Sequence, residues 1–373
     1  MHLLEQAQAE IGSEMTVPLF QGSIYALTLY DVCDEIDLSR LPALISAKRL
    51  VPAFKHTTPE YVRFESPPVT ESLGPLVLDT GEQVEGTMQY YDYGVVSVLL
   101  QRTFSGNWSE VQQLAARWIS SVFFEEFTTR LVRQRLVSLG PALRNPYSVF
   151  LSEDYYVFHL SGPEGLRAED LIRQHGQEIS QIITGESGVL SLAERDEILA
   201  ARTSYYATDL TVVAWNAAFV YDTPSGVAST IRILEYANSQ LLQFRHYDEF
   251  LTRELKQVYT FLEARRGRWT AWRMQPAVAR LRTVRLEVTQ LAEHTTNALK
   301  FVGDMFSARL YKLAAAKIGV VEYQELVRDK LRTAHDLYGF MIDQFQQSRM
   351  FLLEFSVVII LLIELFYLFR GGK

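Results

Sequence analysis

The chain has 373 residues, a hydrophobic content of 48% and a formal net charge of −8 at pH 7. This composition excludes an intrinsically disordered chain, and the acidic balance argues against general binding to nucleic-acid phosphates. Cys33 is the only cysteine, which excludes an intramolecular disulfide and a metal site built from several thiolates. Residues 1–15 have neither a basic start nor a continuous apolar stretch, so the sequence predicts no secretory signal.

Residues 1–222 combine strand and helix signals. Runs rich in aromatic and β-branched residues predict strands at residues 23–32, 61–65, 89–100, 155–160 and 210–221. The 3.6-residue apolar period after Ser109 and the capping box of Ser191 and Glu194 predict helices between these strands. Residues 67–86, with several prolines and glycines, predict a polar and poorly packed connection. The sequence therefore predicts an α+β domain with a mixed sheet.

Residues 223–349 predict almost pure helix. Thr223 is a suitable N-cap and Pro224 a suitable first helical residue, so we place a domain boundary here and a long helix up to residue 264. A second helix is expected to begin near Pro276. It carries a seven-residue repeat formed by Leu281, Val288, Thr295 and Val302, interleaved with Val284, Leu291, Ala298 and Met305.

A second repeat follows Gly319 and is formed by Leu331, Tyr338, Phe345 and Leu352, interleaved with Val327, Ala334, Met341 and Ser348. Such repeats are typical of coiled coils. The sequence thus predicts a coiled-coil-like helical hairpin, whose seams either close within one chain or join two chains. We favour the homo-oligomer.

Residues 350–369 form the most apolar stretch of the chain. As a helix they would extend about 30 Å, which matches the hydrocarbon core of a membrane. Arg349 and Arg370 flank the stretch, and residues 370–373 form a short tail. We therefore expect a single transmembrane helix, a tail anchor; the alternative is a buried helix of a soluble fold.

Two acidic residues, Glu354 and Glu364, interrupt this apolar stretch. A carboxylate is costly inside a membrane, by about 2.5–3.5 kcal/mol at the centre of a helix. Glu364 either faces a partner helix or a polar cavity, or it is protonated or reaches toward the headgroups. The sequence leaves these alternatives open.

Specific catalytic and metal-binding motifs are missing from the sequence. It contains no G-x-G-x-x-G, no Walker-type loop, no H-E-x-x-H and no G-x-S-x-G, and its seven histidines are scattered. We therefore predict no catalytic residues, no metal ligands and no cofactor, and we favour a protein that is not an enzyme.

A polar cluster is expected at the junction of the two predicted domains. Its residues are Asp209, Trp215 and Asn216 from the α+β part and Arg245, His246 and Asp248 from the first long helix. Arg245 and Asp248 are three residues apart and share a helix face. The favoured interpretation is a structural ion pair at the junction, and the alternative is an unfamiliar enzyme site.

Basic and aromatic residues alternate between the two long helices. They are Arg265, Arg266, Arg268, Trp269, Trp272 and Arg273. This pattern suits anionic lipid headgroups or single-stranded nucleic acid. We rank lipid above nucleic acid because the predicted topology brings this turn close to the membrane, and an ordinary solvated turn is the simplest explanation.

Several segments resemble the family named for Required for Meiotic Nuclear Division. They are residues 34–41 (DEIDLSRL), 91–100 (YDYGVVSVLL), 209–222 (DLTVVAWNAAFVYD), 234–251 (LEYANSQLLQFRHYDEFL) and 352–366 (LLEFSVVIILLIELF). The resemblance implies an N-terminal α+β domain, a C-terminal helical region and a terminal membrane helix in which Glu354 and Glu364 match recurring acidic positions. Eukaryotic members support translation of organelle-encoded proteins at the mitochondrial inner membrane, as tethers.

From these features we expect a non-catalytic, membrane-anchored scaffold or tether with its N-terminal domain in the cytoplasm. The absence of a targeting peptide favours a bacterial inner membrane over a mitochondrial one. The expected partners are the lipid bilayer, further copies of the chain and an unidentified protein, whereas nucleic acid is not favoured. The alternatives are a ribosome- or RNA-associated factor that supports translation, and an enzyme with a site at the domain junction.

Overall fold

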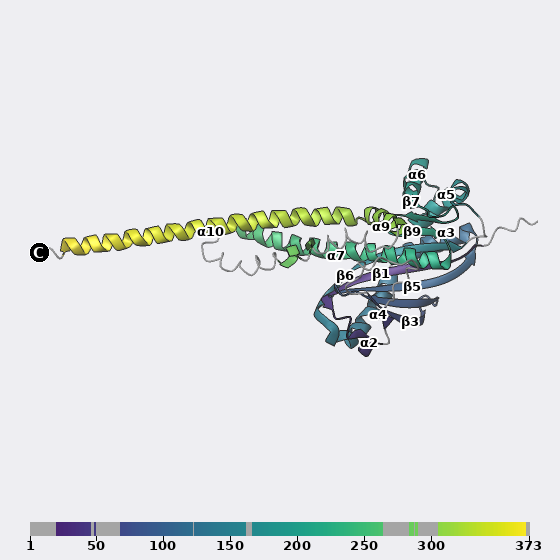
Figure 1. Ribbon diagram of the computed structural model, residues 1–373, viewed down its shortest axis with the longest axis horizontal. Coiled ribbons are helices and arrows are strands. Elements are labelled where there is room, and N and C mark those ends of the chain that lie inside the picture. Colours follow the sequence, from purple (N-terminus) through teal and green to yellow (C-terminus); the bar gives the residue numbers. More distant parts are fainter. Residues whose placement is uncertain are drawn as a thin grey trace, which may run out of the picture. The chain divides into compact units, whose positions relative to one another are not determined.

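The structure is a computed structural model that describes residues 20–45, 48–49, 68–121, 123–161, 166–263, 283–286, 288–289 and 305–370 (Figure 1). Its strands are β1 (Phe20–Ile36), β2 (Lys48–Arg49), β3 (Val69–Val77), β4 (Gln83–Tyr90), β5 (Val95–Gly106), β6 (Leu143–Ser161), β7 (Arg202–Thr203), β8 (Leu210–Val213) and β9 (Ala217–Tyr221). Its helices are α2 (Leu41–Leu44), α3 (Trp108–Ile119), α4 (Phe123–Leu139), the short 3₁₀ helix η1 (Gly140–Ala142), α5 (Ala168–Thr184), α6 (Leu192–Ala200), α7 (Pro224–Glu263), α9 (Met305–Ile318) and α10 (Val320–Arg370).

The chain divides into two compact units. The first consists of Met1–Leu242 and Asn297–Val320, and the second of Gln243–Thr296 and Val321–Lys373. The first unit holds all the described strands, in a nine-stranded sheet of order β2-β3-β4-β5-β1-β6-β9-β8-β7. All neighbouring strands are antiparallel except β6 and β9, which are parallel. The predicted α+β class is therefore confirmed for this unit.

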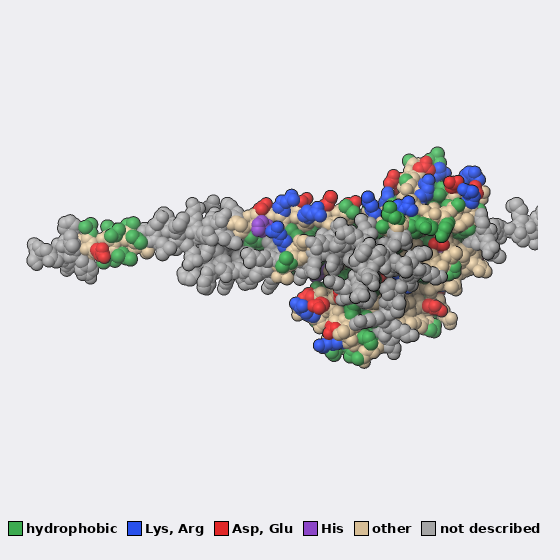
Figure 2. Space-filling view, viewed as in Figure 1, with side chains coloured by type: hydrophobic (Ala, Val, Ile, Leu, Met, Phe, Trp, Pro, Cys, Tyr) green, Lys and Arg blue, Asp and Glu red, His purple; other side chains and the backbone are tan. Residues whose placement is uncertain are grey.

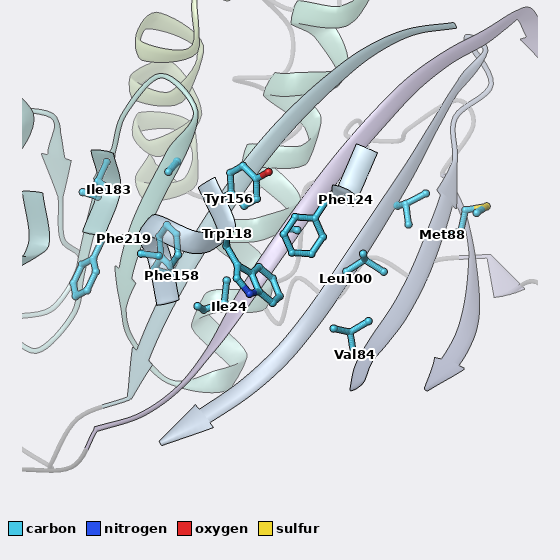
Figure 3. Packing of buried hydrophobic residues seen from close by; sticks show 14 of the residues in the cluster. Ile24, Val84, Met88, Leu100, Trp118, Phe124, Tyr156, Phe158, Ile183 and Phe219 are labelled. Carbon is cyan, nitrogen blue, oxygen red and sulfur yellow. The ribbon is translucent and has the colours of Figure 1, made fainter. Parts of the chain in front are cut away.

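The central strand β1 is buried on both faces, because helices cover both sides of the sheet. Ile24, Ala26 and Tyr30 point to one face and join a core with residues of α3, α4 and α5, whereas Leu27 and Leu29 point to the other face. Figure 3 shows the first core, in which Trp118 of α3 and Phe124 of α4 lie over the sheet. Burial on both faces explains why the middle of β1, residues 24–30, is mainly apolar.

Two of the predicted strands are β-hairpins in the structure. Residues 89–100 contain the end of β4, a turn and the start of β5, and residues 210–221 contain β8, a turn and β9. The first turn ends at Gly94, which has a φ of +83°, and a Cβ on this residue would lie 1.7 Å from the backbone oxygen of Cys33. Glycine is thus required at this position. The aromatic residues around it favour strands, so the sequence predicted one continuous strand instead of a turn.

Other local predictions have mixed outcomes. Residues 67–86 were expected to form a loose connection, but the described residues from Val69 onward form β3, a turn and the first part of β4, which pair as a hairpin. The helix predicted after Ser109 is present as α3, but its N-cap is Asn107, two residues before the predicted cap Ser109, in a capping box with Glu110. The predicted N-cap Ser191 is confirmed at the start of α6. The predicted strand at residues 61–65 lies outside the described residues.

The start of α7 is also confirmed, since this helix begins at Pro224 and the hydroxyl of Thr223 accepts a hydrogen bond from the N–H of Gly226 at 3.2 Å. Between residues 230 and 242 the helix is buried almost completely around its circumference. It packs on the face of the sheet opposite the α3–α5 core, and α9 lies against β7 and β8. A helix buried on all sides presents every side chain, apolar or polar, to a neighbouring element.

The second unit contains a pair of parallel helices. Lys330 of α10 donates hydrogen bonds to Asp248 at 2.5 Å and to Thr252 at 2.7 Å, both on α7. Further along both helices, the hydroxyl of Tyr338 lies 3.5 Å from Oε2 of Glu254. The contacts advance in the same direction along both helices, which makes them parallel.

The seam of this pair follows the second seven-residue repeat. Val327, Ala334 and Tyr338 are buried and Leu331 is half-buried, as the repeat predicts for the first part of α10.

Candidate functional site

The first candidate site is a buried polar cluster between the sheet and α7. Its centre is Glu235, whose side chain is 1% exposed. The amide Nε2 of Gln89 donates a hydrogen bond to Oε2 of Glu235 at 2.7 Å, and the hydroxyl of Ser97 donates to Oε1. Gln89 and Ser97 are direct cross-strand partners on β4 and β5. The strand register therefore places two donors side by side beneath one helical carboxylate.

The turn between β4 and β5 supplies two tyrosines to this cluster. Tyr91 donates a third hydrogen bond to Glu235, and the hydroxyls of Tyr93 and Ser239 lie 2.8 Å apart. The two tyrosine rings are 5.2 Å apart. Because the glycine turn at Gly94 is pressed against β1, these rings are held in place by the backbone.

Helix α9 closes the cluster from another side. The hydroxyl of Tyr311 donates a hydrogen bond to Oε1 of Gln240, and its ring lies 5.9 Å from that of Tyr236. Two polar atoms of α7, Oδ1 of Asn238 and Nε2 of Gln240, are buried without a hydrogen-bond partner among the described residues. Buried polar atoms without a partner are rare and costly, and they are often found at functional sites.

Burial determines the electrostatics of this cluster. Loss of water raises the pKa of Glu235 to about 7, although the hydrogen bonds from Ser97, Tyr91 and Gln89 and the positive charge of Arg232 oppose the rise. Burial also raises the pKa values of Tyr91 and Tyr93 well above the ordinary value, so both phenols stay protonated. Glu235 is therefore a carboxyl group that exchanges its proton near neutral pH, inside a site made of neutral donors.

The second candidate site is an exposed apolar segment near the end of α10, which we define as residues 356–365. Its large apolar side chains have exposed fractions from 40% to 58%, and they are Val357, Val358, Ile359, Ile360, Leu361, Leu362, Ile363 and Leu365. Figure 2 shows hydrophobic side chains at the surface near this end of the chain, with an acidic side chain among them. In this segment of the sequence, Glu364 is acidic and exposed. A continuous exposed apolar surface of this kind marks a site of association.

The residues of the predicted junction cluster belong to two separate units of the structure. Asp209 belongs to the first unit, where its carboxylate accepts hydrogen bonds from the N–H groups of Tyr205 and Tyr206, each at 2.7 Å. Trp215 is 62% exposed and, with Asn216, lies in the turn after β8, at the other end of this strand from Asp209.

The remaining three residues of the predicted cluster, Arg245, His246 and Asp248, lie half-buried on α7 in the second unit. There Asp248 pairs with Lys330, a partner that the sequence had not indicated. The junction cluster as a whole stays a prediction.

The other predicted site residues lie largely outside the description. Arg265, Arg266, Arg268, Trp269, Trp272 and Arg273 all fall outside the described residues, so the lipid and nucleic-acid interpretations of this turn stay predictions. Glu354 lies within α10, and Glu364 is exposed in the apolar segment. Among the described residues, no group of three or more His, Cys, Asp or Glu side chains could hold a metal ion.

The membrane prediction for residues 350–369 is contradicted. Within the described part of the chain, no helix combines the length and the apolar character that a membrane crossing requires. A crossing needs about 20 predominantly apolar residues. Within the apolar segment, Glu364 ends the apolar run after Ile363. The predicted tail anchor and the predicted single-pass membrane location are therefore wrong.

Sequence reasoning missed the Glu235 cluster. The signal available was the segment LEYANSQLLQ at residues 234–243, in which polar and apolar residues alternate without the one-sided period of a surface helix. This pattern is compatible with a helix buried on all sides, but the donors from β4 and β5 are more than a hundred residues away in the sequence.

The described fold and sites define an α+β protein with a helix-covered, mainly antiparallel sheet, followed by long helices. Residues 21–228, which are more than half of the chain, match the model of the family described as "Uncharacterized protein MJ0711, N-terminal domain". The chain belongs to this family, and the resemblance to the Required for Meiotic Nuclear Division family is wrong. The matched region runs from the second residue of β1 into the first turns of α7. No curated protein and no solved structure is significantly similar to the chain.

Proposed function

We propose that this protein is a non-catalytic scaffold that acts through protein–protein contacts and assembles with further copies of itself through the apolar segment of α10. The supporting observation is the exposure of eight large apolar side chains in this segment. Completing the burial of one such side chain is worth about 1 kcal/mol, so covering the side chains along one face of the segment would contribute several kcal/mol before the cost of association.

A second copy is the occupant that the sequence pattern favours. The repeat that is buried in the first part of α10, at Ala334 and Tyr338, continues in the same register to Ile359 and Leu362. Residues of one register lie on one stripe of a helix, so the stripe that packs against α7 in the second unit becomes exposed in the apolar segment. Parallel copies that join their α10 helices along this stripe would extend the same packing.

The position of Glu364 is compatible with this arrangement. It follows Ile359 by five residues and Leu362 by two, which places it on the side of the helix away from the stripe. In the proposed oligomer its carboxylate stays in contact with water and needs no buried partner.

The finer domain predictions belong to the same proposal. We propose that the α+β part of the scaffold ends at residue 222 and that residues 223–349 form its coiled-coil-like helical region. The start of α7 at Pro224 supports a change to helix after residue 222, although the first compact unit extends to Leu242 and includes α9. The burial of Val284 and Val288, which belong to the first seven-residue repeat, supports the coiled-coil-like region. The RNA-associated and enzymatic alternatives stay untested predictions without a supporting observation of their own.

The proposal is tested by the oligomeric state of the full chain, measured by analytical ultracentrifugation. We expect an oligomer for the unchanged chain and a monomer for the double substitution Ile359→Glu and Leu362→Glu, because two charges would enter the stripe. The matched control is Val357→Glu, which adds a charge seven residues before Glu364 on the same outer face and leaves the oligomer intact. A monomeric unchanged chain would overturn the proposal.

A further inference from the structure

Among the described residues, three side chains donate hydrogen bonds to Glu235, and the positive charge of Arg232 acts on it. Gln89, Ser97 and Tyr91 all donate to its carboxylate, and Arg232, three residues earlier on α7, is half-buried. Removing a carboxylate from water costs free energy that neutral donors repay only in part. The buried position therefore favours the protonated form of the Glu235 side chain over the charged form.

Other titratable groups around Glu235, within the described part of the chain, come from the turn between β4 and β5 and from two helices. The turn carries Asp92 with the two tyrosines. On the helices, α7 adds Tyr236 and α9 adds Tyr311. The carboxylate of Asp92 raises the pKa values of Tyr93 and Tyr236, in addition to the larger effect of burial, so these tyrosines are neutral.

We propose that Glu235 is a proton-binding site and that this proton sets how tightly the first half of α7 is held against the sheet. With the proton bound, the side chain is neutral and α7 packs on β4 and β5. Release of the proton leaves a buried charge beneath a helix that has no exposed face, and α7 loosens to let water reach the carboxylate. The ligand is thus a single proton, and the site does not depend on the proposed assembly through α10.

The direction of the pH dependence follows from the shift. The pKa of Glu235 rises from 4.5 to about 7 on folding, so the folded chain holds a proton that the unfolded chain has already lost. The resulting stabilisation is complete below about pH 4.5 and disappears as the pH rises to about 7. A shift of this size corresponds to a change on the order of 100-fold in the unfolding equilibrium of this helix.

Hydrogen exchange of the backbone amides in residues 227–242 of the full chain tests this proposal, with protection factors compared at about pH 5 and about pH 9. We expect protection to fall by at least about 10-fold at the higher pH in the unchanged chain. In Glu235→Gln, a neutral side chain of the same shape, protection should be equal at both values. Equal protection in the unchanged chain, or an undiminished pH response in Glu235→Gln, would overturn the proposal.

Two further variants complete the experiment. Glu71→Gln is the matched control, because Glu71 is also buried but pairs with Arg135 and accepts a hydrogen bond from Tyr90, so the response of α7 should be unchanged. Ser97→Ala removes one donor that favours the charged form, and it should shift the loosening of α7 to higher pH. If Glu235→Gln does not fold, the shift of the loosening to higher pH in Ser97→Ala tests the proposal, and an unchanged pH in this variant would contradict it.

Discussion

The first half of α7 and the end of α10 show opposite distributions of polarity. Between residues 230 and 242, α7 buries Glu235, Asn238 and Gln240, whereas the apolar segment of α10 exposes valine, isoleucine and leucine side chains. Both helices depart from the usual rule of apolar side chains inside and polar ones outside. The difference teaches that each departure requires a compensation: hydrogen-bond partners within the fold for α7, and a covering surface from outside for α10.

The largest effect is expected from a substitution that displaces the backbone of the turn between β4 and β5, which carries two tyrosines of the Glu235 cluster. Gly94→Ala places a Cβ 1.7 Å from the backbone oxygen of Cys33, so the turn that carries Tyr91 and Tyr93 must move. We expect a loss of about 4 kcal/mol in the free energy of unfolding, measured by chemical denaturation.

Gly81→Ala is the matched control for this substitution. Gly81 has the same φ of +83°, but its added Cβ meets nothing within 4 Å. The loss should be only about 1 kcal/mol, the cost of the backbone conformation. Equal losses for the two variants would show that the contact with β1 is unimportant.

A smaller effect is expected when α7 is made to resemble the apolar segment of α10. Glu235→Leu removes the acceptor of Gln89 and Ser97 and leaves both donors buried without a partner. We expect a loss of about 3 kcal/mol in the free energy of unfolding at neutral pH, although leucine is the more hydrophobic side chain. A gain in stability would mean that polarity at this position serves no structural purpose.

The smallest effect is expected in the first part of α10, which packs against α7 and is therefore unlike the exposed apolar segment at its end. Lys330→Ala removes the hydrogen bonds to Asp248 and Thr252. Because Lys330 and Asp248 are only 25% and 18% exposed, we expect a loss of about 1 kcal/mol, reduced at high salt. Lys317→Ala, whose partner Glu197 is 71% exposed, should change the stability by less than about 0.3 kcal/mol. Losses of equal size in both variants would contradict the role of burial.

Local signals in the sequence predicted part of the fold correctly. Ser191 and Thr223 indicated the starts of α6 and α7, because a capping side chain acts within three or four residues of itself. The hairpin turn at Gly94 was missed, because tyrosines and valines on both sides of it have a strong preference for strands. The order of the nine strands was not predictable, since it depends on pairings between distant segments.

The sites were harder to predict than the helices. The partners of Glu235 come from β4 and β5, and no periodicity of α7 indicates which strands it covers. At the other end of the chain, hydrophobicity alone suggested a membrane helix, which the described structure contradicts. The exposed fractions of Ile359 and Leu362 depend on tertiary packing, which a sequence pattern does not contain.

The single parallel pairing in the sheet has a consequence for the order of folding. Tyr156 of β6 pairs with Ala217 of β9, and α5, α6, β7 and β8 lie between them in the sequence. Bringing such distant segments together is slow, because the entropy of the intervening chain must be overcome first. Helix α7 follows β9 directly, so we expect it to dock late. Until then we expect Gln89 and Ser97 to stay in contact with water on the face of the sheet that α7 later covers.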